Sequence, residues 1–317
     1  MIRPLIVIRH VPRIDFMRWH VLGFALSILL GAVSIGISAA IGLNLGIDFK
    51  GGTVIEITYA HPVDFERVRA AIDKLSLGEF SVQSFGASNT ALVRLPLKEG
   101  QSSAQLSERV MSALKADDPS ATQQRVEYVG PQVGKELYEN GALALLLVSL
   151  GIVAYLALRF EWRFAVAAII ANLHDVVIIL GFFALFQWEF SLPVLAAVLA
   201  VLGYSVNESV VIADRIRENF RKMRKATVIH VIDNAITSTI SRTIITHGCT
   251  LTMVLSIFFF GGETLHHFAL ALAIGICFGI YSSALVMASL VMWLGVSRED
   301  LVKRERASGP SGEKILP

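Results

Sequence analysis

The stretch "GYSVNESVVIADRIRENF", residues 203–220, begins inside an apolar run and ends in a basic one. Its first half belongs to the apolar segment 192–213, and its second half carries Arg215 and Arg217. About twenty apolar residues are enough for a helix to cross a bilayer. The stretch therefore predicts the end of a membrane span, with Glu208 inside the membrane and the arginines just outside it.

The composition of the whole chain is that of a membrane protein. Of its 317 residues, 54% are hydrophobic and 17% are charged, and the mean hydropathy is +0.61. A formal net charge of +2, without a basic stripe, argues against a nucleic-acid-binding protein. Cys249 and Cys277 lie far apart in apolar stretches, so we expect neither a disulfide framework nor a zinc site. No cofactor or other metal site is predicted.

Six apolar stretches come close to the length that spans a membrane. The first is too long for the apolar core of a signal peptide, so it is expected to remain as an anchor. The predicted spans are 21–43, 142–158, 164–186, 192–213, 240–260 and 268–294. The sequence therefore predicts a membrane α-helical protein with six transmembrane helices, the last five forming a region at 140–296.

The distribution of lysine and arginine predicts the orientation of the spans, because cytoplasmic segments carry an excess of positive charge. Basic residues precede the first span and follow the second, fourth and sixth, whereas the loops "QWEFS" and "GGETLHH" have none. Both termini, 1–20 and 297–317, and the basic loop 214–226 are therefore predicted to be cytoplasmic. The loop is also expected to contact anionic membrane lipid.

The polar segment 44–139, predicted on the opposite side of the membrane, has the pattern of an α+β domain. Strands are predicted from alternating hydrophobic residues and helices from their 3.6-residue periodicity. The strands are expected at 53–60, 79–86, 91–97 and 123–130, and the helices at 65–75 and 103–116. This order is the ferredoxin-like βαββαβ arrangement. The segment has no cluster of cysteine or histidine residues, so we expect a scaffold or a polypeptide-contact module.

Charged residues inside the spans are few, and each costs at least about 2.5 kcal/mol at a helix centre, so each is a functional candidate. The third span holds His174 and Asp175, the fourth Glu208 and the fifth Arg242. We expect Glu208 and Arg242 to meet, because the fourth span leaves the membrane where the fifth enters it. Arginine stabilises a buried carboxylate and desolvation destabilises it, so a small change of geometry can load or release a proton.

Hydroxyl groups are expected to extend this proton path. Residues three or four apart share a helix face. The two polar stripes that this rule predicts are Thr239, Arg242, Thr246, Cys249 and Thr250 in the fifth span, and Tyr204, Ser205 and Glu208 in the fourth. Thr243 and Thr246 can continue the hydrogen-bonded path. The alternative that stays open is a buried ion pair that only fixes helix packing.

Two further groups in the spans have open interpretations. Neighbours on a helix point about 100° apart, so His174 and Asp175 cannot both face one partner, and a functional role and a local polar plug both remain possible. In the sixth span, small residues four apart allow another helix to approach closely. This packing face is predicted to consist of Gly275, Gly279, Ser282 and Ser283.

The motif "GIDFKGG", residues 46–52, follows the first span. It lacks the Gly-Lys-Ser/Thr ending of a phosphate-binding loop, and no helix is predicted after it. Gly51 and Gly52 are expected to permit a tight junction between the membrane region and the α+β domain.

These motifs together resemble the SecD/SecF family of protein-export membrane proteins, a branch of the resistance-nodulation-division superfamily. The resemblance covers nearly the whole chain. It rests on "GIDFKGG", "GYSVNESVVIADRIRENFRK", "SRTIITHGCT" and "GICFGIYSS", in that order. It implies an accessory subunit of the bacterial inner membrane, with a periplasmic α+β domain and no covalent chemistry of its own.

The resemblance also implies partners and a mechanism. Together with SecD, a homologous six-span subunit, the chain is expected to use inward proton flow to move periplasmic domains and complete protein export. The further expected partners are the Sec channel, made of SecY, SecE and SecG, the accessory protein YajC and the unfolded preprotein. An alternative on the same architecture is half of a proton-driven small-molecule or lipid exporter, which the small insert disfavours.

The family motifs assign roles to individual residues. Glu208 is implied as the proton-path carboxylate, where many relatives have aspartate, and Arg242 as its basic partner. The resemblance implies that Thr243 and Thr246 supply hydroxyls of the path, Asn207 the amide beside the acid, and Asp48 a structural or coupling group at the junction. His247 and Cys249 depart from the small or hydroxyl residues of relatives.

A third alternative is an intramembrane enzyme in which His174, Asp175 and Glu208 act as metal ligands or acid-base groups. The chain has no H-E-x-x-H or G-x-S-x-G motif, which disfavours this interpretation.

Overall fold

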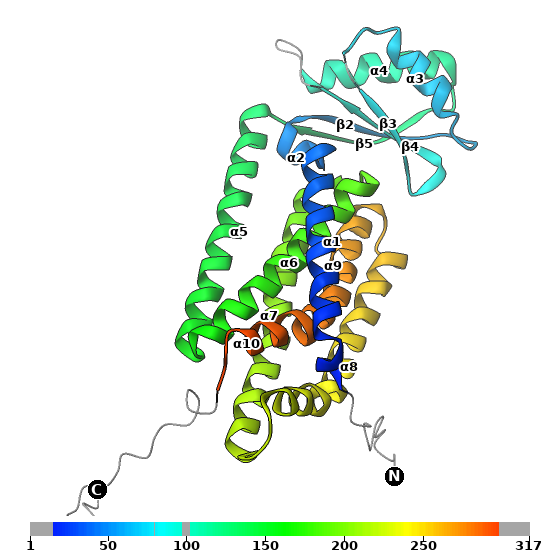
Figure 1. Cartoon of the computed structure of the whole chain (residues 1–317). Helices are drawn as coiled ribbons and strands as arrows, with labels where there is room; N and C mark the ends of the chain where they lie inside the picture. The colour runs from blue at the N-terminus through cyan, green and yellow to red at the C-terminus, as the bar shows by residue number, and fades with distance from the viewer. Residues whose placement is uncertain (1–14, 79, 97–101, 298–317) are drawn as a thin grey trace, which may run out of the picture.

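The computed structural model describes residues 15–78, 80–96 and 102–297. A bundle of long helices carries a smaller α+β domain at one end, just beyond the point where α1 leads into α2 (Figure 1). Most of the predicted terminal segments, 1–20 and 297–317, lie outside the described residues.

Six of the described helices are long and apolar enough to cross a membrane, which confirms the predicted number of spans. The first follows a short 3-10 turn, η1 (Phe16–Trp19), and the last continues into a π-helical segment, η2 (Ser282–Met287), and α10 (Ala288–Trp293). The helices are α1 (His20–Ala40), α5 (Pro131–Arg159), α6 (Trp162–Phe186), α7 (Leu192–Lys222), α8 (Val228–Phe260) and α9 (Glu263–Tyr281).

Several helices extend beyond the apolar stretches that predict them. The helix α5 starts at Pro131 instead of 142, and α8 starts at Val228 instead of 240. The basic segment 214–226, predicted as a loop, is helical as far as Lys222. An apolar run marks only the part of a helix that can lie in lipid, whereas backbone hydrogen bonds continue the helix into water.

The α+β domain has the predicted βαββαβ order. Its four strands form an antiparallel sheet in the order β3-β4-β2-β5. The elements are β2 (Gly52–Thr58), α3 (Phe65–Asp73), β3 (Ser81–Phe85), β4 (Ala87–Leu95), α4 (Ser103–Asp117) and β5 (Thr122–Val129). The ferredoxin-like arrangement is therefore confirmed, although residues 87–90, predicted as a connection, belong to β4.

The core of this domain lies between the sheet and its two helices, which cover one face of the sheet (Figure 1). Ile55 and Ile57 are fully buried there, and they pack in one cluster with Ile72 from α3 and Val110 from α4. Alternation along β2 therefore sends every second side chain to the helices, as the sequence predicts. The opposite face of the sheet is turned toward the helix bundle (Figure 1).

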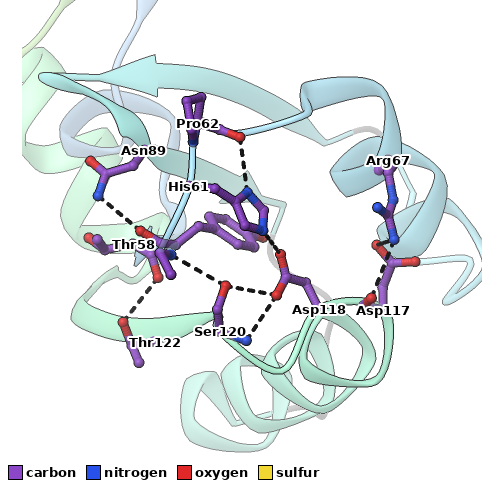
Figure 2. Close-up of polar contacts among 11 residues, drawn as sticks. Thr58, His61, Pro62, Arg67, Asn89, Asp117, Asp118, Ser120 and Thr122 are labelled. Atoms are coloured by element: carbon purple, nitrogen blue, oxygen red, sulfur yellow. Dashed lines mark hydrogen bonds and ion pairs between the residues drawn. The ribbon is translucent and has the colours of Figure 1, made fainter.

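A cluster of polar contacts joins the segment after β2 to the turn between α4 and β5 (Figure 2). His61 Nε2 lies 2.7 Å from Asp118 Oδ2, while the backbone N–H and hydroxyl of Ser120 donate to Asp118 Oδ1 at 2.9 and 2.7 Å. The hydrogen bonds from Ser120, and then the His61 side chain, hold the pKa of Asp118 below its usual value. Burial, together with the Asp118 and Asp117 carboxylates, raises the pKa of Tyr59 to about 12.

The centre of the bundle depends on close contacts at glycine. A Cβ atom added at Gly275 in α9 would lie 2.3 Å from Cγ2 of Val201 in α7, and one at Gly181 in α6 would lie 2.3 Å from Cβ of Ser34 in α1. Such separations are far inside van der Waals contact. Only glycine lets these helices approach to the observed distance.

Replacement of Gly275 by alanine is expected to destabilise the bundle, because overpacking costs about 1–3 kcal/mol and exceeds the gain from a less flexible unfolded chain. Gly151 in α5 is the matched control, since a Cβ atom there meets nothing within 4 Å. Thermal unfolding in detergent should show a lower midpoint for Gly275→Ala and no loss for Gly151→Ala. Val201→Ala should partly rescue Gly275→Ala. Equal behaviour of the two glycine variants would contradict the close contact.

Acidification is expected to lower the local stability of the α+β domain around Asp118. Because folding lowers the pKa of Asp118, its stabilising contribution is present above the ordinary value of 3.8 and is lost as the pH falls below it. Hydrogen exchange of β2 and β5 peptides in the full chain, corrected for intrinsic rates, should show less protection at about pH 3 than at about pH 6. Asp118→Asn should reduce this difference, whereas Asp73→Asn, on the exposed side of α3, should retain it. An unchanged difference in Asp118→Asn would disprove the assignment.

Candidate functional site

The carboxylate of Glu208 lies inside the bundle. Its side chain comes from α7, the residue is only 4% exposed, and Oε1 accepts a hydrogen bond of 2.5 Å from the hydroxyl of Thr243 in α8. The expected contact between the fourth and fifth spans is therefore made, and the hydroxyl of Thr243 is the group that makes it.

Arg242 does not pair with Glu208. Arg242 is exposed, and no ion pair among the described residues joins it to Glu208. Successive residues on a helix point about 100° apart. Because Thr243 is the residue that faces Glu208, Arg242 is turned away from that contact and lines the open groove between α7 and α8 instead. The predicted pairing is therefore absent from the structure of the single chain.

The buried polar face of α8 shares Thr239 with the predicted stripe and then continues one residue later at each turn. Thr246 is exposed, and its hydroxyl donates to the carbonyl of Arg242 at 2.9 Å. The buried positions are Thr239, Thr243 and His247, which also follow a spacing of four. The spacing rule permits both stripes, and packing against α7 selects the second.

His247 is a buried member of this face, although its sequence context marks it only as a departure from relatives. Its Nδ1 lies 3.0 Å from the carbonyl oxygen of Thr243, and its ring packs edge-on against Tyr204 with centroids 5.0 Å apart. Its Nε2 is buried without a hydrogen-bond partner in the described part of the chain. Its spacing of four from Thr243 was the signal that could have placed it there.

Asn207 lies about 100° around α7 from Glu208, in an open groove between α7 and α8. The groove has a volume of about 400 Å³. Its polar lining includes Asn207, Asp214, Ser238, Thr239 and Arg242. The groove lies toward the end of the bundle far from the α+β domain (Figure 1). Water in this groove would contact Asn207, the chain neighbour of the buried Glu208.

A second buried carboxylate, Asp175 in α6, has a more complete set of partners. Its Oδ2 accepts hydrogen bonds from Ser205 in α7 at 2.7 Å and from Ser282 in η2 at 2.8 Å. Nδ1 of His174 lies 3.3 Å from Oδ1. The two neighbours in α6 thus contact each other, and they do not need to share one distant partner.

The small residues predicted as a packing face have two different surroundings. Gly275 contacts Val201, and a Cβ atom at Gly279 would lie 3.4 Å from the Ser205 hydroxyl. Ser282 bonds Asp175, and the hydroxyl of Ser283 lies 3.3 Å from that of Ser209. The glycines therefore allow close approach, while the serines join a polar network across the same contact.

The junction motif links the domain to α7. Asp48, in the short helix α2 (Ile47–Lys50), accepts a hydrogen bond of 2.7 Å from the backbone N–H of Leu192, the first residue of α7. A carboxylate at this position accepts from a backbone N–H group that has no partner within the helix. Its negative charge also interacts favourably with the positive end of the helix dipole. Gly51 has φ 72°, and a Cβ atom at Gly52 would lie 2.9 Å from the carbonyl oxygen of Leu95.

Two further contacts reinforce the junction. The short strands β1 (Asn44–Leu45) and β6 (Glu189–Phe190) pair in parallel, and an ion pair joins Arg94 of β4 to Glu189. Burial raises the pKa of Glu189, and the guanidinium of Arg94 opposes this shift. The loop before α7 is thus held by both the sheet and the motif that follows α1.

Comparison with known proteins gives consistent matches over most of the chain. Residues 109–297 match the family described as "Protein export membrane protein SecD/SecF, C-terminal", and residues 36–63 match the "SecD/SecF GG Motif". The chain is 43% identical to the protein translocase subunit SecF of Vibrio alginolyticus over 290 residues, 91% of this chain and 92% of that protein. It is 42% identical to SecF of Escherichia coli O157:H7 over 309 residues, 96% and 95% of the two chains.

Solved structures agree with these matches. The crystal structure of SecDF, a translocon-associated membrane protein from Thermus thermophilus, has a TM-score of 0.80 at 37% identity. The match covers 89% of this chain and 39% of that one. SecDF in its Super-membrane-facing form gives a TM-score of 0.69 at 36% identity, covering 92% and 40%. The chain thus spans about two fifths of the SecDF chains.

Removal of the Thr243 hydroxyl is expected to destabilise the bundle, because a buried carboxylate left without its donor costs about 1–3 kcal/mol. Thr243→Val keeps the shape of the side chain. Thr252→Val is the control on the same helix, since its exposed hydroxyl donates to the carbonyl of Gly248. Chemical unfolding in detergent micelles should show the loss for Thr243→Val alone. Equal losses would mean that the contact with Glu208 contributes nothing.

Proposed function

Since the chain belongs to the SecD/SecF family of protein-export membrane proteins, we propose that it works with SecD to couple inward proton flow to protein export. In this role it is a multi-pass subunit of the Sec protein translocase. Its α+β domain faces the periplasm and its termini face the cytoplasm. The unfolded preprotein, the Sec channel of SecY, SecE and SecG, and YajC are its further proposed partners.

The buried Glu208 carboxylate is the observation that carries this proposal. A charge in the membrane interior is stable only with a cation or a full set of hydrogen bonds, and otherwise the group takes up a proton. In the single chain Glu208 has the hydroxyl of Thr243 and no arginine. In the proposed function this carboxylate takes up a proton while it lacks a charged partner and releases the proton when one approaches.

Arg242 and Asn207 complete the path at a contact with SecD. An exposed arginine in a membrane helix costs several kcal/mol unless a protein partner or the membrane surface receives it. Arg242 and Thr246 lie on the exposed side of α8, and Asn207 lies on the exposed side of α7. The longer SecDF chains, of which this chain matches about two fifths, support a second subunit, and we infer that it covers this face.

The helix α7 transmits the effect of the proton to the α+β domain. Its first residue is held by Asp48, the loop before it is held by Arg94 through Glu189, and Glu208 lies 16 residues further along. This separation corresponds to about 24 Å along a rigid helix. A shift of α7 on protonation of Glu208 thus moves the junction, and with it the domain that meets the preprotein.

An exporter of small molecules or lipids is the less favoured function. The relatives reported above are translocase subunits, and the described insert is a single βαββαβ domain. The contacts that support the export role, at Glu208 and at the start of α7, do not involve a lipid-binding pocket.

Glu208→Gln and Arg242→Met are each expected to slow protein export several-fold in cells that lack the native subunit and contain SecD. Glutamine keeps the size of the side chain but cannot exchange a proton. Glu208→Asp is the control, because it keeps a titratable carboxyl group. The measurement is pulse-chase maturation of an exported preprotein, together with growth in the cold. Normal export and growth in both variants would refute the proton-path assignment.

A further inference from the structure

We propose that Asp175 and His174 form a second proton-binding site, which passes protons to or from Glu208. The proposal rests on the proton-driven function proposed above. The second carboxylate lies in a different helix from Glu208, and Ser205 of α7 lies between the two acids.

The position of Asp175 makes a permanent charge costly. It lies 13 residues from the start of α6 and 11 from its end, which is about 17–20 Å from either end of the helix. The residue is fully buried. Among the described residues no lysine or arginine forms an ion pair with it, and His174 is the one basic group in contact.

The neighbouring imidazole lets this site hold one proton in two arrangements. The proton resides on His174 beside a carboxylate, or on Asp175 beside a neutral ring, and the pair has no net charge in either case. The side chain of His174 is 10% exposed, and its buried Nε2 atom has no hydrogen-bond partner in the described part of the chain. The ring therefore has one nitrogen toward Asp175 and a second nitrogen available for exchange.

The other groups that face Asp175 do not compete for this proton. The contacting side chains from α7 and η2 are the hydroxyls of Ser205 and Ser282. The phenol ring of Tyr281, at the end of α9, lies 6.4 Å from the His174 ring, and its hydroxyl donates to the carbonyl of Gly23 in α1. Further along α7 lies Glu208, and Tyr204, beside Ser205, donates its hydroxyl to Thr250 and packs against His247.

The exchange step needs only a proton and the rotation of hydroxyl groups. When Asp175 takes up a proton, its new O–H donates to one serine oxygen, and that serine turns its own hydrogen to another acceptor. When the proton leaves, the carboxylate again accepts from both serines. One proton enters and one leaves, and no other bond changes. Serine hydroxyls suit this step because they both donate and accept.

The connection to Glu208 runs along α7. Ser205 and Glu208 are three residues apart and share a helix face. Glu208 lies one turn further toward the basic end of the helix, and its chain neighbour Asn207 lines the open groove. Asn172, also fully buried and one turn from Asp175 in α6, has no partner for either polar side-chain atom in the described residues. Such an amide suits a water molecule on a proton route.

Infrared difference spectra of the purified complex with SecD, recorded between acidic and alkaline pH, test the site directly. We expect two carboxylic-acid C=O bands, one lost in Asp175→Asn and the other in Glu208→Gln. Asparagine can still accept hydrogen bonds from Ser205 and Ser282, so packing is retained. Ser282→Ala should shift the Asp175 band. Ser289→Ala, a buried serine that donates to its own helix at Leu285, should leave the band unchanged.

Proton flux into liposomes that contain the complex gives a second readout. Asp175→Asn should lower the flux about tenfold or more, and Asp175→Glu should restore part of it. If Asp175→Asn retains both carboxylic-acid bands and the proton flux of the unmodified complex, whereas Glu208→Gln loses a band and the flux, Asp175 is not a proton-binding site. The proton-driven function would still stand. If neither variant changes the spectrum or the flux, the proposed function fails as well.

Discussion

The need to solvate two carboxylates inside lipid governs the interior of this protein. The bundle meets it with hydroxyl groups: Thr243 donates to Glu208, and Ser205 and Ser282 donate to Asp175. A direct arginine contact would favour the charged form of each acid. A hydroxyl can serve the charged and the neutral form, so the interior tolerates both protonation states.

The packing of the helices follows from the short reach of these hydroxyls. Serine and threonine bond a carboxylate only when their helix backbone lies close to it. Gly275 lets α9 approach α7, and Gly279 leaves room beside Ser205. The same α7 is held at its other end by Asp48. The helix at the centre of the polar network is thus also the one fastened to the α+β domain.

The fold was predictable because it depends on local patterns, whereas the site depends on which helix faces meet. The lengths of apolar runs predicted six spans, and alternation predicted the βαββαβ domain. On α8, however, the stripe through Arg242 and the stripe through Thr243 obey the same spacing, and only contact with α7 distinguishes them. Ser282 was predicted to serve packing because its partner Asp175 lies in a span far away in the sequence.

The π-helical segment η2 has a consequence for how the interior can rearrange. A π turn holds one residue more than an α turn, so it acts as a dislocation in the hydrogen-bond register of the helix. Migration of that dislocation by one position would exchange a few backbone bonds and turn Ser282 by about 100° away from Asp175. The helix would remain folded throughout. The sixth span can therefore present or withdraw a hydroxyl without sliding as a rigid rod.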